Sequence, residues 1–234
     1  MRITLGKETL HTLRPSEFNR RILVMTAVSA EMEAVLRGLG DEKRFDVSLA
    51  GVGSAAAAAN TAKALAKAHY EYDLVVSAGI GGGFPGIAEV GSLVVASKVV
   101  AADLGVETEE GFTGLDELGL GQICFQVDTN LAYQVQEAFC SAGLAVSIGP
   151  VLTVSTVTGT NAGAIELARR IPGAAAEAME GYGVAVAAAD CDIPMLEIRA
   201  ISNLVGPRDL TKWRVKEALN ILEAAGSVLR EVLL

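Results

Sequence analysis

The chain has 234 residues, of which 51% are hydrophobic and only 5% aromatic, and it carries a formal net charge of −9. This length suits one large α/β domain whose core is filled by Ala, Val, Leu and Ile. An acidic chain without a cluster of Lys and Arg argues against nucleic acid and against anionic membranes as partners.

No apolar run reaches the roughly 18 residues that are needed to span a bilayer. Three widely spaced cysteines match neither a disulfide framework nor a metal site, which favours a reducing, cytoplasmic setting. The first twenty residues mix charge and polarity without the apolar centre of a signal peptide. We therefore expect an N-terminal extension at 1–20, followed by one domain at 21–234.

Hydrophobic patterning predicts strands and helices that alternate through the domain. Continuous apolar runs indicate buried strands, and apolar positions three or four residues apart indicate helices. The predicted strands are 21–29, 45–51, 73–79, 91–103, 146–157, 174–178 and 194–202. The predicted helices are 30–40, 54–69, 128–142, 162–171, 180–190 and 211–232. The stretch 104–127 is expected to be an irregular loop, and the alternation predicts an α/β fold with a largely parallel or mixed sheet.

Two glycine-rich stretches follow predicted strands and are candidates for ligand contact. "GVGSAA" (51–56) fits the dinucleotide fingerprint, with Glu71 and Asp73 about 20 positions downstream. It follows the second strand rather than the first, so a tight turn is the favoured interpretation. "GIGGGFPG" (79–86) offers backbone N–H groups to a small anionic or oxygen-rich ligand, with a plain turn as the alternative. A P-loop is excluded because no Gly-Lys-Ser/Thr follows.

Three carboxylates and one amide lie at the ends of predicted strands or the starts of predicted helices, where polar side chains can contact a ligand. Glu31 and Glu33 begin the first predicted helix two positions apart, so they face different ways, and acids there also favour the helix dipole. Glu180 precedes a helix of Gly, Ala and Val that will be buried. A buried carboxylate needs hydrogen bonds, either from free helix amides or from a ligand's hydroxyls. Asn203 follows a buried strand at its carboxyl end, where α/β proteins place their chemistry.

Two kinds of catalytic site are not supported by the residues. His11 and His69 join no Cys or carboxylate pattern with ligand spacing, so the sequence predicts no metal site. A nucleophilic triad is equally unsupported, because the chain has no G-x-S-x-G.

Four stretches resemble the nucleoside phosphorylase and nucleosidase superfamily, and most closely its bacterial methylthioadenosine and adenosylhomocysteine nucleosidases. They run in family order through nearly all of the chain after residue 21, at 22–35, 50–83, 154–181 and 194–206. The resemblance implies a single-domain, three-layer α/β fold with a mixed central sheet flanked by helices. It also implies cleavage of a purine nucleoside without a cofactor, by a homodimer or larger homo-oligomer.

The resemblance further implies roles for particular residues. Glu33 would match the acid that activates the attacking water, with Glu31 as the alternative. Glu180, together with Met179, would match the ribose site, and Asn203 the residue that faces the departing base. Further contacts to the base or the ribose are implied for Ile80, Gly81, Gly82, Val157, Thr158 and Trp213.

Phosphorylases of this superfamily bring arginines to a phosphate ion. Neither "TAVSAEME" (26–33) nor "SAGIGGGFPG" (77–86) contains an arginine. Water is therefore the expected nucleophile and hydrolysis the expected reaction. A phosphorylase that takes its arginine from a neighbouring subunit stays the alternative.

Asn203 occupies the position where methylthioadenosine nucleosidases have an Asp. A protonated Asp can donate to N7 of adenine and accept from the 6-amino group, whereas a 6-oxopurine presents two acceptors, N7 and O6. An amide NH₂ can serve both acceptors, while a carboxylate facing O6 leaves acceptors unpaired at a cost of about 1–3 kcal/mol. Asn203 therefore predicts hypoxanthine or guanine as the leaving base, rather than adenine.

An Asn at this position, followed by "GPRD" and Trp213, resembles the futalosine hydrolases of the superfamily. That resemblance implies release of hypoxanthine from futalosine on a route to menaquinone, with Arg208 or Lys212 available for the substrate's carboxyphenyl group. The alternatives are a methylthioadenosine-type nucleosidase, a purine nucleoside phosphorylase, and a non-catalytic dinucleotide-binding or sensor domain that uses Gly51 and Gly53.

Overall fold

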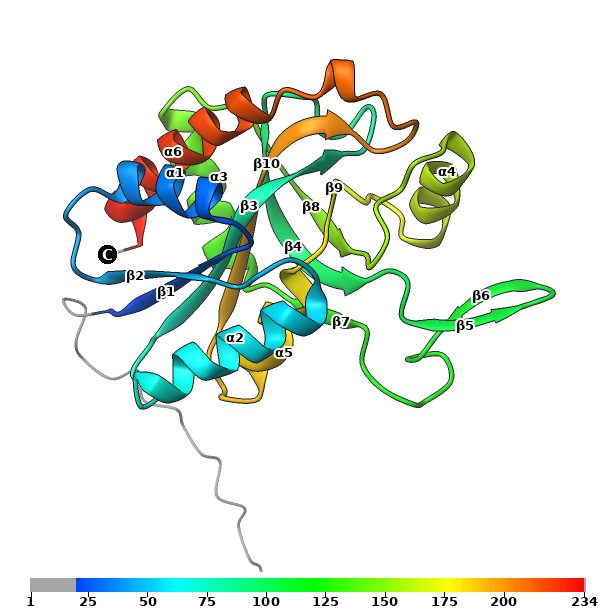
Figure 1. Ribbon diagram of the computed structural model, residues 1–234, viewed down its shortest axis with the longest axis horizontal. Helices are drawn as coiled ribbons and strands as arrows, with labels where there is room; N and C mark the ends of the chain where they lie inside the picture. The colour runs from blue at the N-terminus through cyan, green and yellow to red at the C-terminus, as the bar shows by residue number, and fades with distance from the viewer. Residues whose placement is uncertain (1–19, 234) are drawn as a thin grey trace, which may run out of the picture.

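A computed structural model describes residues 20–233, so the predicted extension lies outside the described residues apart from Arg20 (Figure 1). The strands are β1 (Ile22–Thr26), β2 (Phe45–Leu49), β3 (Leu74–Gly83), β4 (Leu93–Ala101), β5 (Gly105–Thr108), β6 (Gly111–Gly114), β7 (Cys124–Gln126), β8 (Val146–Thr153), β9 (Ala176–Ala178) and β10 (Met195–Leu204). The helices are α1 (Ser29–Leu39), α2 (Ser54–Lys67), α3 (Thr129–Ser141), α4 (Asn161–Arg170), α5 (Gly181–Ala189), the short 3₁₀ helix η1 (Leu210–Lys212) and α6 (Val215–Val232). Strands and helices alternate as the patterning predicts.

The eight-stranded sheet is mixed and partly closes on itself. Strand β3 pairs in parallel with β1 and β10, and β10 pairs antiparallel with β4. Strands β4, β8 and β9 continue in parallel, and β9 returns antiparallel to β3. The strands β3, β10, β4, β8 and β9 therefore form a closed ring, which β1 and β2 extend at β3. This ring brings residues from distant parts of the chain to one place.

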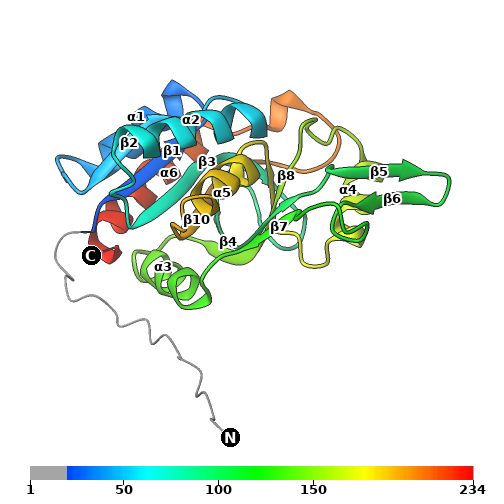
Figure 2. The same cartoon turned by 90° about the horizontal axis from the view of Figure 1, so that it is seen from below.

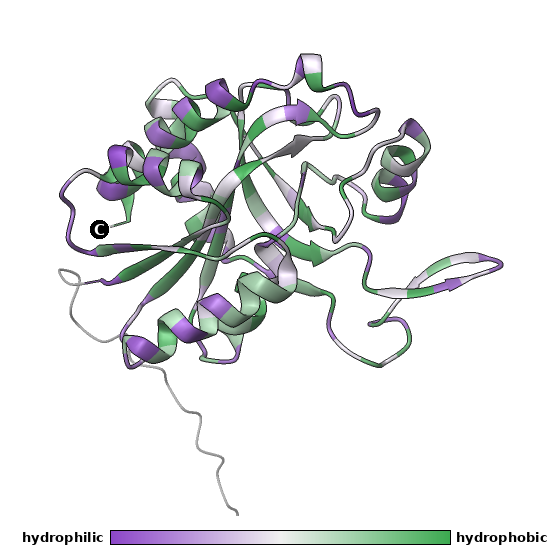
Figure 3. Cartoon of the chain, in the orientation of Figure 1, coloured by the Kyte–Doolittle hydropathy of each residue, from purple (hydrophilic) through white to green (hydrophobic). Residues whose placement is uncertain are grey.

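Helices pack on both sides of the sheet and give the three layers that were predicted. Helices α1 and α6 pack together on one side, and α2 and α5 pack together on the other (Figure 1). The core strands carry apolar side chains, and Figure 3 shows the hydrophilic residues gathered on the outer parts of the helices. Six of the nine residues of α5 are buried, as its Gly, Ala and Val composition predicts.

The region 104–127 differs from the prediction of an irregular loop. It contains a hairpin, β5–β6, which projects from the body of the molecule (Figure 2), and a short strand, β7, which pairs with β4. These strands have only three or four residues each, too few to give a periodic apolar signal.

Two element boundaries also differ from the predictions. The stretch at 79–86 is not a simple turn, because β3 continues through its glycines to Gly83 and pairs there with β10 and β9. The last helix begins at Val215 rather than at residue 211. Asp209 accepts a hydrogen bond from the backbone of Thr211, and this favours a separate 3₁₀ turn before the helix.

Candidate active site

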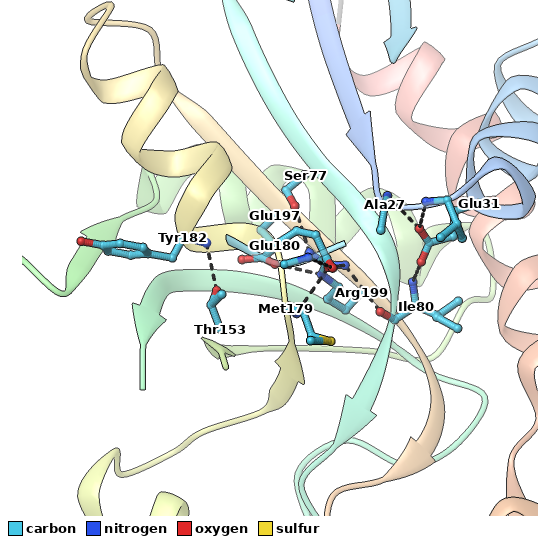
Figure 4. A network of polar contacts seen from close by, with 12 residues as sticks. Ala27, Glu31, Ser77, Ile80, Thr153, Met179, Glu180, Tyr182, Glu197 and Arg199 are labelled. Atoms are coloured by element: carbon cyan, nitrogen blue, oxygen red, sulfur yellow. Dashed lines mark hydrogen bonds and ion pairs between the residues drawn. The ribbon is translucent and has the colours of Figure 1, made fainter. Parts of the chain in front are cut away.

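A buried cluster of charged side chains lies where β3, β10 and the β9–α5 connection meet (Figure 4). Glu180, Arg199 and Glu197 are 6%, 1% and 0% exposed. Arg199 Nη1 lies 3.3 Å from Glu180 Oε2, and its Nε lies 2.8 Å from Glu197 Oε1. Its Nη2 donates to the hydroxyl of Ser77 at 3.0 Å. One guanidinium therefore fixes two carboxylates in the interior.

Glu180 is further held by the backbone. Its Oε1 accepts from the N–H of Gly53 at 3.2 Å, and its Oε2 accepts from the N–H of Met179 at 3.3 Å. Gly53 belongs to the stretch that fits the dinucleotide fingerprint and stands just before α2. A carboxylate of the protein thus contacts the glycine turn that a dinucleotide phosphate would require, so the geometry does not favour dinucleotide binding.

Each charged side chain in this cluster affects the pKa of its neighbours. Burial raises the pKa of the Glu197 carboxyl, although Arg199 opposes that change. Burial also disfavours the charged form of Arg199, but the carboxylates of Glu197 and Glu180 outweigh it, so the pKa of the guanidinium is raised. Arg199 consequently stays charged, and Glu197 is the partner that makes this charge tolerable in the core.

We predict that Glu197→Leu lowers the free energy of unfolding by about 3–5 kcal/mol, because it leaves Arg199 without its shortest ion pair in the core. Urea denaturation measures the change. The matched control is Glu223→Leu, which removes an equally short pair with Arg37, at 2.7 Å, but on the surface. That control should cost less than about 1 kcal/mol. Equal losses in the two variants would contradict the role given to Glu197.

Glu31, and not the predicted Glu33, lies beside this cluster. Glu31 is 3% exposed; its Oε2 accepts from the N–H of Ala27 at 2.9 Å, and its Oε1 accepts from the N–H of Ile80, also at 2.9 Å. It occupies the third position of α1, from which a carboxylate can reach back to the free N–H groups that precede the helix. Glu33 is exposed, because two positions along a helix turn a side chain to a different face.

Gly79 explains how Glu31 and Arg199 approach each other. A Cβ at this position would lie 2.7 Å from Arg199 Nη1 and 2.7 Å from Glu31 Oε1. Only a glycine in β3 leaves room for both groups, which lie over the same face of the strand at this point.

Asn203 lies near the end of β10, opposite Gly82 of β3. The register of the two strands shifts between Ile201 and Asn203, and such a bulge re-aims the side chain that follows it. The amide oxygen of Asn203 accepts from the hydroxyl of Ser202 at 2.8 Å. Its NH₂ donates to the carbonyl of Leu204 at 3.1 Å, which leaves the second N–H of that group to donate elsewhere.

The segment that carries Val157 and Thr158 runs between β8 and α4, and both residues are half-buried. The N–H of Thr158 donates to Glu177 Oε1 at 2.9 Å, and its hydroxyl donates to Glu177 Oε2. Glu177 is 5% exposed and was not among the predicted site residues.

The three central predicted contacts, Ile80, Gly81 and Gly82, lie on β3 among these groups. Ile80 hydrogen-bonds to Glu31, and the hydroxyl of Ser202 lies 3.3 Å from the carbonyl of Gly81. Gly82 pairs with β10 on one side and with β9 on the other. The structure therefore brings most of the predicted residues together around β3.

Trp213 is half-buried and directly precedes a residue that is anchored to the end of β10. The N–H of Arg214 donates to the carbonyl of Ser202 at 2.8 Å. The guanidinium of Arg208 lies 5.4 Å from the centre of the Trp213 ring, within the range of a cation–π contact. Lys212, the other predicted cation, is paired with Asp209 at 3.4 Å on the surface.

A cavity of about 600 Å³ opens beside Met179, between α2, α5 and the ends of β4 and β8. In the part of the chain that the structure describes, no three His, Cys, Asp or Glu side chains gather in a way that could hold a metal ion. Between residues 20 and 233, no helix is long and apolar enough to cross a membrane.

Comparison with known proteins agrees with this geometry. A model of the phosphorylase superfamily matches residues 22–234. The futalosine hydrolase of Streptomyces coelicolor is 49% identical over 230 residues, which cover 91% of this chain and 96% of the relative. The futalosine hydrolase of Acidothermus cellulolyticus is 46% identical over 220 residues, which cover 88% and 89% of the two chains.

The fold is also seen in solved structures. The 5′-methylthioadenosine/S-adenosylhomocysteine nucleosidase from Neisseria meningitidis, in complex with methylthio-immucillin-A, superposes with a TM-score of 0.76 at 20% identity and covers 91% of this chain and 99% of its own. The likeness confirms the predicted nucleoside phosphorylase-like fold. The chain therefore belongs to the phosphorylase superfamily and, within it, to the futalosine hydrolase family.

Proposed function

We propose that this protein hydrolyses the N-glycosidic bond of futalosine and releases hypoxanthine and dehypoxanthine futalosine, on the futalosine route to menaquinone. The observation that carries the proposal is the amide of Asn203, which lies over Gly82 of β3 and keeps an N–H group free to donate. The two relatives described above, both futalosine hydrolases, support the same activity.

Asn203 would bind the leaving base. The N–H of its NH₂ group that does not bond to Leu204 donates between N7 and O6 of hypoxanthine. Negative charge builds up on these atoms as the bond from N9 to the sugar breaks. A donor that is already oriented by Ser202 stabilises this charge without having to reorganise. The amide cannot give up its proton, so the departing base is protonated from solvent.

Glu180 would hold the 2′- and 3′-hydroxyls of the ribose. Its oxygens already accept hydrogen bonds from Gly53, Met179 and Arg199, and the remaining lone pair, on Oε1, is available to the sugar hydroxyls. As the sugar becomes an oxocarbenium-like cation, its attraction to this fixed negative charge strengthens. Binding that is stronger in the transition state than in the ground state accelerates the reaction.

Glu31 would position and deprotonate the attacking water. Its two oxygens are held by Ala27, Val28 and Ile80, and these bonds fix the carboxylate against Gly79 of β3. The water's oxygen bonds to the anomeric carbon, and one of its protons passes to Glu31. This role was predicted for Glu33, but the exposed position of Glu33 does not support it.

The contacts that Arg199 makes within the protein favour hydrolysis over phosphorolysis. This arginine contacts Glu197, Glu180 and Ser77, so its guanidinium is engaged by the protein and not available to a phosphate ion. The base-release assay described in the Discussion tests this, because a phosphorylase would need added phosphate.

The 5′ substituent of futalosine would lie near the stacked pair of Arg208 and Trp213. Trp213 supplies an aromatic face, and Arg208 supplies a cation for a carboxylate on the phenyl group. Arg208 is a stronger candidate than Lys212, whose ammonium is already paired with Asp209.

We also propose a homodimer or larger oligomer in the cytoplasm. Apolar side chains stand exposed near the cavity beside Met179, among them Val52 at 57% and Val186 at 37%. Burial of such a face against a second copy would remove it from water. The three cysteines are free, as a reducing compartment requires. Sedimentation velocity measures the mass, and a monomer at micromolar concentration would contradict the oligomer.

We predict that Asn203→Asp lowers kcat/KM for hypoxanthine release about 10- to 100-fold. A carboxylate facing N7 and O6 leaves acceptors unpaired, at a cost of about 1–3 kcal/mol. Release of adenine from methylthioadenosine should rise above its wild-type rate. Liquid chromatography of the released bases measures both rates, and Asn130→Asp, an exposed site on α3, is the control. An unchanged selectivity between the two bases would contradict the role of Asn203.

A further inference from the structure

Glu177 is a buried acid that has no part in the mechanism above. It lies on β9, is 5% exposed and accepts hydrogen bonds from the N–H and the hydroxyl of Thr158. Burial raises the pKa of this carboxyl, and the bonds from Thr158 oppose that change. Each carboxylate oxygen has two lone pairs, so each can accept one hydrogen bond more.

The register of the sheet aligns Glu177 with Asn203. Gly82 of β3 pairs with Glu177 of β9 on one side and with Asn203 of β10 on the other. Paired residues on neighbouring strands project from the same face of a sheet. The backbones of Glu177 and Asn203 are therefore two strand spacings apart, about 10 Å, with Gly82 between them.

Gly82 contributes no side chain of its own between the two polar residues. A Cβ there would lie 3.1 Å from Val205 Cγ2 and 3.2 Å from Asn203 Nδ2, so Val205 and the amide of Asn203 both lie over this glycine. A flat ring that lies beside Val205, over this part of the sheet, would present one edge to Asn203 and the adjoining part of the same edge towards β9.

The hydrogen-bonding edge of a 6-oxopurine has three groups in sequence: the acceptors N7 and O6, then the donor N1–H. The free N–H of Asn203 can donate to this pair of acceptors, but a donor cannot satisfy the N1–H. Adenine differs at this point, because its N1 is an acceptor. An acceptor on the protein opposite N1 would favour hypoxanthine and disfavour adenine, since two facing acceptors leave both unpaired.

We propose that Glu177 accepts a hydrogen bond from N1–H of the purine and that Glu177 and Asn203 together select 6-oxopurines. This inference rests on the proposed function and adds a second residue that determines its specificity. The carboxylate contacts the base and takes no part in bond breaking. Thr158 holds it in place, which explains why the segment after β8 is anchored to β9 by two hydrogen bonds.

The test measures binding of free bases by isothermal titration calorimetry. Hypoxanthine and 1-methylhypoxanthine differ in the N1 proton. Each is titrated into wild type, Glu177→Gln and the control Glu166→Gln, which changes a partly exposed acid on α4. We expect Glu177→Gln to lower the affinity for hypoxanthine about 10- to 100-fold, which is the range for the loss of a hydrogen bond to a charged group. Binding of 1-methylhypoxanthine should stay as weak as in wild type. The control should bind both bases as wild type does.

The opposite pattern would overturn the inference. If Glu177 only anchors the Thr158 segment, Glu177→Gln lowers the affinity for both bases by the same factor. If Glu177→Gln does not fold, Glu177→Asp is the second variant, because it keeps the negative charge but moves the carboxylate back by one methylene group. The affinity of Glu177→Asp for hypoxanthine should fall, while its affinity for 1-methylhypoxanthine should equal that of wild type. Since binding is measured apart from turnover, a wild-type protein that does not cleave futalosine contradicts the proposed function, whereas an equal loss for both bases contradicts only the role of Glu177.

Discussion

Glu180→Gln is expected to lower kcat about 10³-fold, the upper range for the loss of one preorganised electrostatic contact with a transition state. The amide keeps the shape of the side chain but removes the negative charge that would face the developing oxocarbenium ion. The fold should persist, because Arg199 keeps its shorter pair with Glu197 at 2.8 Å. Steady-state hydrolysis, followed by chromatography of the released base, measures kcat, and circular dichroism measures the melting temperature.

Asp190→Asn is the matched control for this variant. Asp190 is an exposed acid at the other end of α5, so the same change of charge occurs on the same helix far from the cluster. It should leave kcat within about twofold of wild type. A Glu180→Gln enzyme with near-normal kcat would show that this carboxylate does not face the sugar.

Glu31→Gln is expected to lower kcat by 10²- to 10⁴-fold, the range typical of a lost general base. An amide can neither take the proton of the water nor accept from both Ala27 and Ile80 as the carboxylate does. The variant should also lose about 1 kcal/mol of stability, because Glu31 caps α1. Assays well below the melting temperature separate the two effects.

Glu33→Gln is the internal comparison, two residues along the same helix. Its side chain is exposed, so we expect kcat to stay within about twofold of wild type. If Glu33→Gln were the damaging change and Glu31→Gln the harmless one, water activation would belong to Glu33, and Glu31 would only cap the helix.

The choice between these two glutamates shows where the sequence becomes insufficient. The patterning located the first helix and both acids correctly, but each residue along a helix turns the side chain by about 100°. An uncertainty of one residue in the helix start, which is normal, therefore decides which acid faces the sheet. The structure begins α1 at Ser29, and this places Glu31 at the third position.

Glu180 and Asn203 could be found from the sequence because each stands at the end of a clear apolar run. Glu177, Glu197 and Arg199 were missed as site residues, although acids within "AAAEAME" and "PMLEIRAIS" are unusual in buried strands. Their partners could not be found in this way. The contacts depend on the pairing of β3 with β9 and β10, which joins residues about 100 positions apart.

The most direct test of the proposed function is base release in phosphate-free buffer, measured by liquid chromatography with futalosine, inosine and methylthioadenosine side by side. We predict hypoxanthine from futalosine, at a rate that added phosphate does not change, and no adenine from methylthioadenosine. Adenine release as the main activity would contradict the role of Asn203. The absence of any release until phosphate is added would contradict hydrolysis.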